Sequence, residues 1–348
     1  MNVLMIGPAR DVKGGMTTVV DNYFEYGLSS LVKLDYCESI NDKSKFQKGI
    51  KEVCGYIHFC RIVNKYDLVH IHMASGRSTY RKIEYIKKAK KNKKKVVVHI
   101  HGGGFADFYA AQNERNKRKI EKGLNLADKV IVLSQEWKQY FLQIIPKEKL
   151  EILYNGVEVP KEFNKDYNNN RILFLGRLCE EKGVYKLLEA IKVLSVTHPD
   201  IMLNICGSGE EDKILKYIRD NSLSNNVKLI GWVAKYQREK QLKENSIFIL
   251  PSKYEAMPMS LLEAMAYRNI PVCTNVGGIP QIIQDDTNGI LIKKYEVKSI
   301  IEALEKVLDC PQKKKYMAEI SYKTVEEKFN IERNIRLLYE IYIKVWDK

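Results

Sequence analysis

Two glutamates eight residues apart form the most informative pair in the sequence. Glu255 comes shortly after the apolar run Ile247–Leu250, and Glu263 lies within Leu262-Glu263-Ala264-Met265-Ala266, with Ser260 near the start of the same helical pattern. A carboxylate among apolar helix residues needs a polar partner, and a ligand hydroxyl is one. The alternative is a plain exposed helix face.

Two cations occupy a short segment after another apolar strand. Arg177 and Lys182 follow Arg171–Leu175 and precede a helical pattern. Ligands of open α/β sheets bind beyond the carboxyl ends of the strands, and paired cations at that edge suit a diphosphate. A solvated turn in which Glu180 and Glu181 neutralise both cations is the alternative.

A glycine pair follows the first strand. Gly14 and Gly15 lie between the apolar run Val3–Ile6 and a helical pattern that begins near Thr17. Backbone amides at such a position can approach a phosphate, and the helix N-terminus favours negative charge. The segment is neither GxGxxG nor a Walker A loop, so it predicts neither a dinucleotide nor a P-loop site. An ordinary strand-to-helix turn is the other interpretation.

Histidines end a further strand. His99 and His101 alternate along Val96–Ile100 and its continuation, so they share one face, and three glycines follow. No carboxylate or cysteine stands nearby to complete a metal shell. We therefore predict no metal site and expect His101 to be a pocket residue.

The elements that must position these residues alternate along the chain. Unbroken Val/Ile/Leu strands separated by helices predict parallel sheets covered on both faces, that is, two Rossmann-like halves. The expected strands are Val3–Ile6, Leu68–Ile71, Val96–Ile100, Lys129–Leu133, Arg171–Leu175, Met202–Cys206, Val227–Ile230, Ile247–Leu250 and Ile270–Thr274. The expected helices are Tyr80–Lys94, Asn113–Ala127, Val184–Thr197, Asp212–Asn221, Lys235–Glu244, Ser260–Arg268 and a helical segment over Pro311–Lys348. The polar stretch Val159–Asn170 is the predicted linker.

Composition excludes several classes of protein. The chain has 348 residues and 45% hydrophobic residues, which is too apolar for a disordered protein. Its seven cysteines form no CxxC pair and indicate reduced thiols rather than a disulfide frame. No apolar run is long enough to cross a bilayer, and the N-terminus does not resemble a signal peptide. The net charge is +15, of which residues 1–165 carry +12. This half is expected to face nucleic acid, an acidic membrane or a phosphorylated acceptor, unless the charge serves solubility alone.

Taken together, these stretches resemble the retaining glycosyltransferases of family 4. The resemblance rests on Glu255-x7-Glu263, on Gly176-Arg177-x4-Lys182-Gly183, on Asn155-Gly156-Val157 and on Gly277-Gly278-Ile279-Pro280. It implies the GT-B architecture, with two Rossmann-like parallel-sheet domains facing each other across a cleft. The expected domains are 1–160 for the acceptor and 161–330 for the nucleotide sugar, with 331–348 as a helix packing back on the first domain.

The resemblance also implies roles for single residues. Those expected to bind the nucleotide and its diphosphate are Gly14, Gly15, Arg177, Lys182, Gly207, Val233, Ser260, Leu261 and Glu263. Those expected to bind the donor sugar are His101, Glu255, Ala256, Met257, Pro258 and Met259. Glu255, His101, Arg177 and Lys182 would act in catalysis. Family members often carry glycine at the places of Ala256 and Pro258, which leaves the sugar open.

The implied reaction transfers a hexose or N-acetylhexosamine, with retention, from a nucleotide sugar, expected to be UDP-linked. The acceptor would be a polyprenyl-diphosphate-linked or other glycan in bacterial surface polysaccharide synthesis, such as capsule or exopolysaccharide. No DxD motif is visible, so neither a metal nor another cofactor is expected. A nucleotide-sugar 2-epimerase of the same fold, a basic nucleic-acid-binding protein and a non-catalytic partner subunit remain alternatives.

The basic first half is expected to dock on an acidic membrane surface, which places the protein in the cytoplasm at the inner face of the plasma membrane. The residues proposed for this surface or for the acceptor are Lys91, Lys94, Phe105, Phe108, Tyr109 and Arg115. A solvated helix end is the alternative for the lysine-rich segment Lys87–Lys95.

Overall fold

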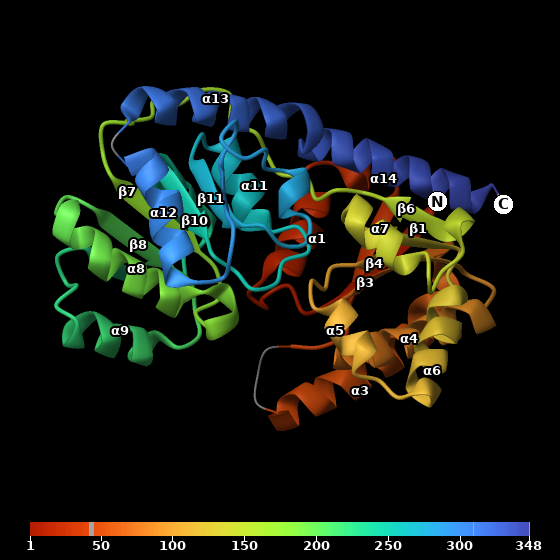
Figure 1. Cartoon of the computed structure of the whole chain (residues 1–348). Coiled ribbons are helices and arrows are strands. Elements are labelled where there is room, and N and C mark those ends of the chain that lie inside the picture. Colours follow the sequence, from red (N-terminus) through yellow and green to blue (C-terminus); the bar gives the residue numbers. More distant parts are fainter. Residues whose placement is uncertain (42–44, 309, 348) are drawn as a thin grey trace. The chain divides into compact units, whose positions relative to one another are not determined.

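The structure of the chain, a computed structural model, describes residues 1–41, 45–308 and 310–347. It contains two compact units. The first comprises Met1–Gly156 together with Ile331–Lys348, and the second comprises Val157–Asn330. Each is an α/β unit built on one six-stranded sheet in which every strand pair is parallel (Figure 1). The predicted Rossmann-like fold class is therefore confirmed.

The first sheet has the strand order β2-β1-β3-β4-β5-β6. Its strands are β1 (Asn2–Gly7), β2 (Lys33–Glu38), β3 (Leu68–Met73), β4 (Lys95–Ile100), β5 (Lys129–Val132) and β6 (Leu150–Ile152). The central strands are almost wholly buried, as expected for a parallel sheet covered on both faces. The chain leaves β1 toward β2 on one side and returns to β3 on the other, so the order reverses between β1 and β3.

Helices cover both faces of this sheet. They are α1 (Gly15–Glu25), α2 (Leu28–Leu31), α3 (Lys45–Ile62), α4 (Arg77–Lys91), α5 (Phe105–Ala110), α6 (Glu114–Asn125), α7 (Gln135–Phe141) and α14 (Ile331–Trp346), with 3-10 turns at Val63–Lys65 and Lys147–Lys149. Figure 1 shows α4 and α14 on opposite sides of the sheet, and both contact β4. The C-terminal helix α14 buries Leu338, Ile341, Tyr342 and Val345 in this unit.

The second sheet has the order β12-β11-β10-β7-β8-β9. Its strands are β7 (Arg171–Leu175), β8 (Met202–Cys206), β9 (Val227–Gly231), β10 (Ile247–Leu250), β11 (Ile270–Thr274) and β12 (Ile290–Ile292). The order reverses between β7 and β10, which pair directly. After these two strands the chain continues toward opposite edges of the sheet. Ligands of open α/β sheets bind at such a reversal of strand order.

The described residues of the second unit form six helices around its sheet. They are α8 (Val184–Thr197), α9 (Glu211–Asp220), α10 (Lys235–Glu244), α11 (Met259–Ala266), α12 (Val297–Leu308) and α13 (Pro311–Lys328), with 3-10 turns at Glu180–Lys182 and Ile279–Gln281. Helix α8 packs against α12, and α11 packs against α13. Figure 1 shows α12 and α13 on opposite sides of the sheet.

The structure contains elements that were not predicted, among them the helices α3 and α12 and three strands. The strands β2, β6 and β12, which no sequence pattern predicted, all lie at sheet edges, where one side of a strand is unpaired and polar residues are tolerated. The C-terminal segment is two helices, α13 and α14, and α14 begins at Ile331, where the expected C-terminal helix 331–348 begins. They part at Phe329 and Asn330, where the Phe329 carbonyl accepts a hydrogen bond from the Val157 amide at 2.9 Å. Among the described residues, no helix is both long and apolar enough to span a membrane.

Candidate functional site

The loops that follow β7 and β10 lie side by side at the carboxyl edge of the second sheet. The amide of Lys253, in the loop after β10, donates to the carbonyl of Glu181, in the loop after β7, at 2.8 Å. The hydroxyl of Tyr295 donates to the neighbouring carbonyl of Glu180. The two segments singled out from the sequence, one cationic and one carboxylate-bearing, are thus joined at the point where the strand order reverses.

An ion pair connects these loops. The Nζ atom of Lys182 lies 2.5 Å from Oε1 of Glu255. The Glu255 side chain is only 9% exposed and that of Lys182 is 28% exposed. Water screens such a partly buried pair less than a surface pair, so each charge holds the other in place. Arg177, from the same loop as Lys182, is exposed.

Glycines allow the loops to approach one another. Gly183 has a left-handed φ of 75°, and a Cβ atom there would lie 2.1 Å from the carbonyl oxygen of Pro251. Gly277 has a φ of 54°, and its Cβ atom would lie 1.7 Å from the carbonyl oxygen of Glu255. Only glycine fits both positions, because a side chain would meet backbone atoms. These contacts give a structural reason for the glycines of both motifs.

The second glutamate lies on α11 with a partner that sequence reasoning missed. Oε1 of Glu263 is 3.4 Å from a guanidinium nitrogen of Arg238 on α10. Burial raises the pKa of Glu263, and the charges of Arg238 and Lys235 oppose this effect. The expected polar partner of Glu263 therefore exists within the protein. No motif marked Arg238, since it lies in the polar helix Lys235–Glu244.

The other residues expected around the donor flank this edge of the sheet. Ala256, Met257, Pro258 and Met259 are all buried and lead into α11, and Leu261 lies fully buried in its first turns. Ser260 is partly exposed. Gly207 follows β8, and its amide donates to the carbonyl of Gly231 at 2.8 Å. Val233 is buried after β9.

The glycine pair of the first unit stands at the N-terminus of α1. The helix begins at Gly15, and Gly14 precedes it with no side chain capping the first turn. A Cβ atom at Gly14 would meet no atom within 4 Å. The hydroxyl of Thr17 donates to the carbonyls of Val12 and Gly14 at 2.7 and 2.6 Å, and these hydrogen bonds hold the glycine loop in place. The backbone at this helix end is thus open to a small anion.

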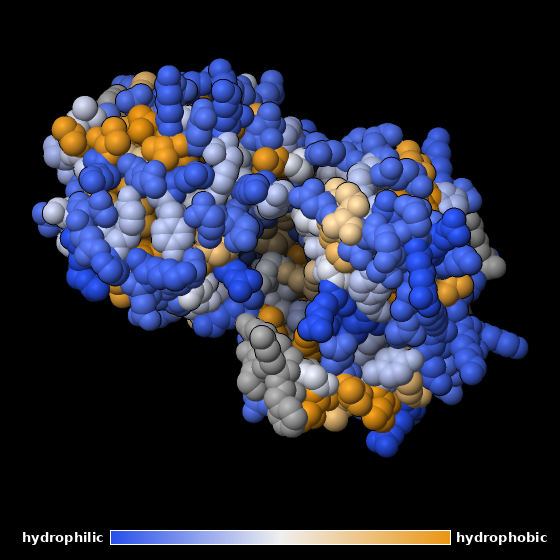
Figure 2. All heavy atoms as spheres, turned by 60° about the horizontal axis from the view of Figure 1, so that its bottom comes forward, coloured by the Kyte–Doolittle hydropathy of each residue, from blue (hydrophilic) through white to orange (hydrophobic). Residues whose placement is uncertain are grey.

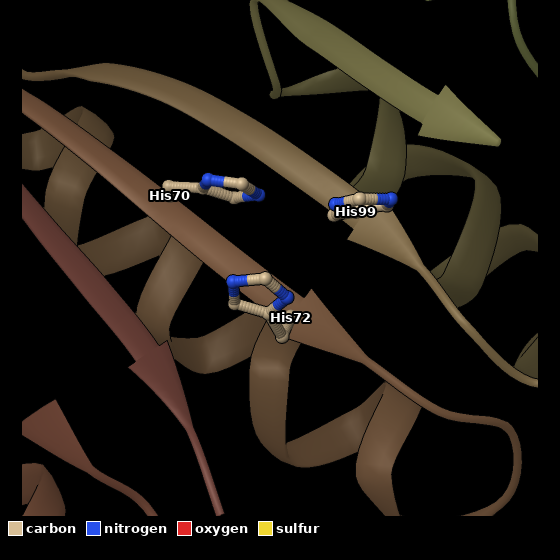
Figure 3. Close-up of side chains that lie close together, drawn as sticks. All are labelled: His70, His72 and His99. Carbon is tan, nitrogen blue, oxygen red and sulfur yellow. The ribbon is translucent and has the colours of Figure 1, made fainter. Parts of the chain in front are cut away.

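Four histidines form a cluster on one face of the first sheet. His70 and His72 come from β3, while His99 and His101 come from β4 and the loop after it. In the parallel register His72 is opposite His99. Figure 3 shows His70, His72 and His99 grouped together over these two strands, and their closest ring nitrogens all lie within 4.8 Å of one another. Sequence reasoning found only the β4 pair, although the tetrapeptide Val-His-Ile-His occurs at 69–72 as well as at 98–101.

The rings of this histidine cluster lie against one another, some stacked and some tilted. The ring centroids of His70 and His72 are 4.4 Å apart with an interplanar angle of 21°, and those of His99 and His101 are 4.2 Å apart. A metal binds along an imidazole lone pair, which lies in the ring plane. The ring planes of His70, His72 and His99 are inclined to one another by 16° to 30°, so their in-plane lone pairs are not aimed at one common point in this arrangement.

Burial keeps the histidine cluster uncharged. It lowers the pKa of His70 and of His101 to about 3, and it holds those of His72 and His99 well below the ordinary value, with the neighbouring imidazoles adding to the effect. Neutral imidazoles can donate or accept hydrogen bonds, but they cannot stabilise an anion by charge near pH 7.

Comparison with known families decides what this site belongs to. Residues 157–324 match the family model described as glycosyl transferases group 1, and residues 52–160 match the model described as glycosyltransferase family 4. The chain belongs to the family 4 type of glycosyltransferases. The recognition made from the sequence motifs is confirmed.

Known relatives align in sequence with this glycosyltransferase over most of its length. It is 27% identical to a 41.2 kDa protein in the cps region of Klebsiella pneumoniae, covering 88% of this chain and 89% of that one. It is also 27% identical to the UDP-Gal:alpha-D-GlcNAc-diphosphoundecaprenol alpha-1,3-galactosyltransferase of Escherichia coli, covering 84% and 80%. Among solved structures, Anabaena Alr3699/HepE in complex with UDP superposes with a TM-score of 0.78 at 17% identity, covering 99% and 100%. The fold is GT-B.

The surface expected to meet a membrane is only partly exposed in this glycosyltransferase. Lys91 and Arg115 are exposed, whereas Lys94 is half-buried and donates to the Asn64 carbonyl at 2.9 Å. Phe108 and Tyr109 are half-buried. The expectation fails for Phe105, which is fully buried in the core of the first unit because it packs against Phe141.

Proposed function

We propose that the protein transfers a hexose or N-acetylhexosamine from a UDP-sugar to a lipid-linked or other glycan acceptor, with retention and without a metal. The observation that carries the proposal is the Lys182–Glu255 pair at the point of strand-order reversal in the second sheet. The UDP in the HepE complex and the name of the Escherichia coli relative support the choice of donor and acceptor class. Surface polysaccharide assembly fits the Klebsiella relative in a cps region.

In this proposal the ion pair is the state of the site without donor. The diphosphate of the donor would compete with Glu255 for the Nζ atom of Lys182, and Arg177 from the same loop would add a second positive charge. Glu255, released from Lys182, would then accept a hydrogen bond from a donor-sugar hydroxyl, which the family resemblance assigns to position 3. This residue pair would thus contact both the sugar and the diphosphate, which lie on the two sides of the scissile bond.

The nucleoside would be recognised next to this pair. Glu263 would accept hydrogen bonds from the two ribose hydroxyls, and Arg238 would hold its carboxylate in the ionised form despite burial. Buried Val233 and the segment Met257–Leu261 would enclose the base and the sugar with apolar contacts.

Front-face transfer needs few dedicated groups. The glycosidic bond of the donor breaks as the acceptor hydroxyl attacks on the same face, and the departing phosphate oxygen takes the acceptor proton. Lys182 and Arg177 would stabilise the developing phosphate charge, and the amides at Gly14 and Gly15 would bind its distal phosphate. Preorganised groups of this kind supply the largest share of catalysis in most enzymes. His101 would bind the sugar near position 6.

Membrane docking is the second part of the proposal. The residues Ile50, Val53 and Ile57 are exposed by 49%, 59% and 44% and share one side of α3, at helical spacing. Figure 2 shows that hydrophilic residues dominate one face of the protein and that apolar atoms gather there in only a few groups. An apolar helix side within a half of the chain that carries +12 suits an anionic lipid surface.

The test of the function is transfer itself. The purified chain is incubated with a panel of UDP- and GDP-sugars and an undecaprenyl-diphosphate-linked sugar, and NMR of the product gives the anomeric configuration. We expect a product with a UDP-sugar, in the presence of EDTA, with the donor's configuration. Rearranged or hydrolysed donor in the absence of acceptor would favour the epimerase instead. An inverted product, or loss of transfer with EDTA, would contradict the mechanism.

A further inference from the structure

His101 is the one member of the histidine cluster that is not fully buried. His70, His72 and His99 are 0% exposed, whereas His101 is half-buried at the start of the glycine-rich loop after β4. Its Nε2 atom is 2.9 Å from Nδ1 of His72. The ring of His101 is also stacked on that of His72, with centroids 5.1 Å apart and an interplanar angle of 22°. Nδ1 is therefore the ring nitrogen of His101 that remains for a ligand.

The direction of this hydrogen bond decides what His101 offers. A neutral imidazole carries one N–H and one bare nitrogen, so His72 either donates from Nδ1 or accepts there. If His72 accepts, its own N–H is at Nε2, which is buried and has no partner. If His72 donates, the bare lone pair is at Nε2 instead. Orphaned buried N–H groups are rarer than under-satisfied acceptors, so the second arrangement is favoured.

We propose that His72 is a positioning residue that donates from Nδ1 to Nε2 of His101, so that His101 carries its proton on Nδ1 and presents a neutral N–H donor to the ligand. The role of that donor toward a sugar oxygen rests on the proposed function; the tautomer does not. His101 then acts as a fixed hydrogen-bond donor and not as an acid or base.

The fixed tautomer can be observed without turnover. The chain holds six histidines, so labelling histidine with 15N gives a small set of imidazole signals whose shifts separate protonated from bare nitrogens. We expect His101 to show N–H at Nδ1. His72→Phe keeps an aromatic ring but removes the donor, and we expect His101 to become a mixture of tautomers. His72→Asn restores an N–H near the position of Nδ1 and should restore the single tautomer.

His99→Phe is the matched control. His99 also packs against His101, with ring centroids 4.2 Å apart, but among the described residues both of its ring nitrogens lack hydrogen-bond partners, so this variant should leave the tautomer of His101 unchanged. Circular dichroism shows whether each variant is folded.

Transfer assays add the functional readout. Losing one hydrogen bond between neutral groups should lower kcat about fivefold in His72→Phe, and His72→Asn should recover most of it. An Nε2–H tautomer in the unsubstituted chain, an unchanged tautomer in His72→Phe, or an unchanged kcat would each overturn the proposal. A chain that transfers no sugar would refute the proposed function while the NMR result still decides the tautomer.

Discussion

Lys182 is the residue whose charge the proposed reaction needs most. Lys182→Gln keeps an N–H for Glu255 but removes the positive charge near the leaving phosphate. We expect kcat/KM to fall by about 10²- to 10³-fold, the usual loss for one preorganised stabilising group. Steady-state kinetics with the best donor measures this. Lys192→Gln is the control, since Lys192 is an exposed lysine of α8 that donates a hydrogen bond to Asn221. Equal kinetics for both variants would remove Lys182 from the mechanism.

His99 shows the cost of the buried imidazoles. Both of its ring nitrogens are buried without a hydrogen-bond partner among the described residues, and the side chain is 0% exposed. A buried polar group without a partner costs about 1–3 kcal/mol. We therefore expect His99→Leu, a change of similar volume, to raise the free energy of unfolding by about 1 kcal/mol in urea titrations. A lower stability would show that packing of the His99 ring contributes more than its unpaired nitrogens cost.

At the scale of elements, two glycine variants distinguish the effect of the close contact between two loops from the effect of backbone strain. Gly183→Ala combines a left-handed φ with a Cβ clash against Pro251, whereas Gly76→Ala has a similar φ of 71° and no atom within 4 Å of the Cβ. Strain alone should cost both variants about 1 kcal/mol. We expect only Gly183→Ala to lose donor affinity as well, measured by calorimetric titration with UDP. Equal affinities would show that the loop contact does not shape the site.

The apolar side of α3 predicts a lipid contact. Val53→Asp places a charge where Val53 would enter the membrane, so vesicle sedimentation should show about a tenfold lower partition onto anionic vesicles. Val196→Asp on α8, where Val196 is 83% exposed, is the control and should bind as the parent chain does. Equal binding of the parent chain to neutral and anionic vesicles would remove the membrane proposal.

At the scale of the whole molecule, the histidine cluster makes stability depend on pH. In the unfolded chain a histidine takes up a proton below about pH 6.5, but in the folded chain burial lowers the pKa of His70 to about 3. Because the unfolded state binds more protons in this window, stability falls as the pH drops from 6.5 toward 3, by up to about 1.4 kcal/mol per pH unit for each such group. Urea midpoints between pH 7 and pH 5 should show this slope. His70→Phe should reduce it, and an unchanged slope would contradict the assignment.

The position of a strand within its sheet explains whether the sequence could predict it. Central strands such as β7 and β10 are continuous apolar runs because helices cover both faces, so they were visible in the sequence. The edge strand β2 alternates charged and apolar residues in Lys33–Glu38, and a pattern of that kind does not distinguish a strand from a loop.

The sequence by itself determined the two Rossmann-like halves, the family and the motif residues, because strand periodicity and loop motifs are local features. Only the tertiary structure decided partners: Glu255 with Lys182, Glu263 with Arg238, and His101 with His72 are separated by 73, 25 and 29 positions. It also decided that Phe105 is core and not surface. Such pairs depend on which strands become neighbours, and strand order is set by the packing of the whole sheet.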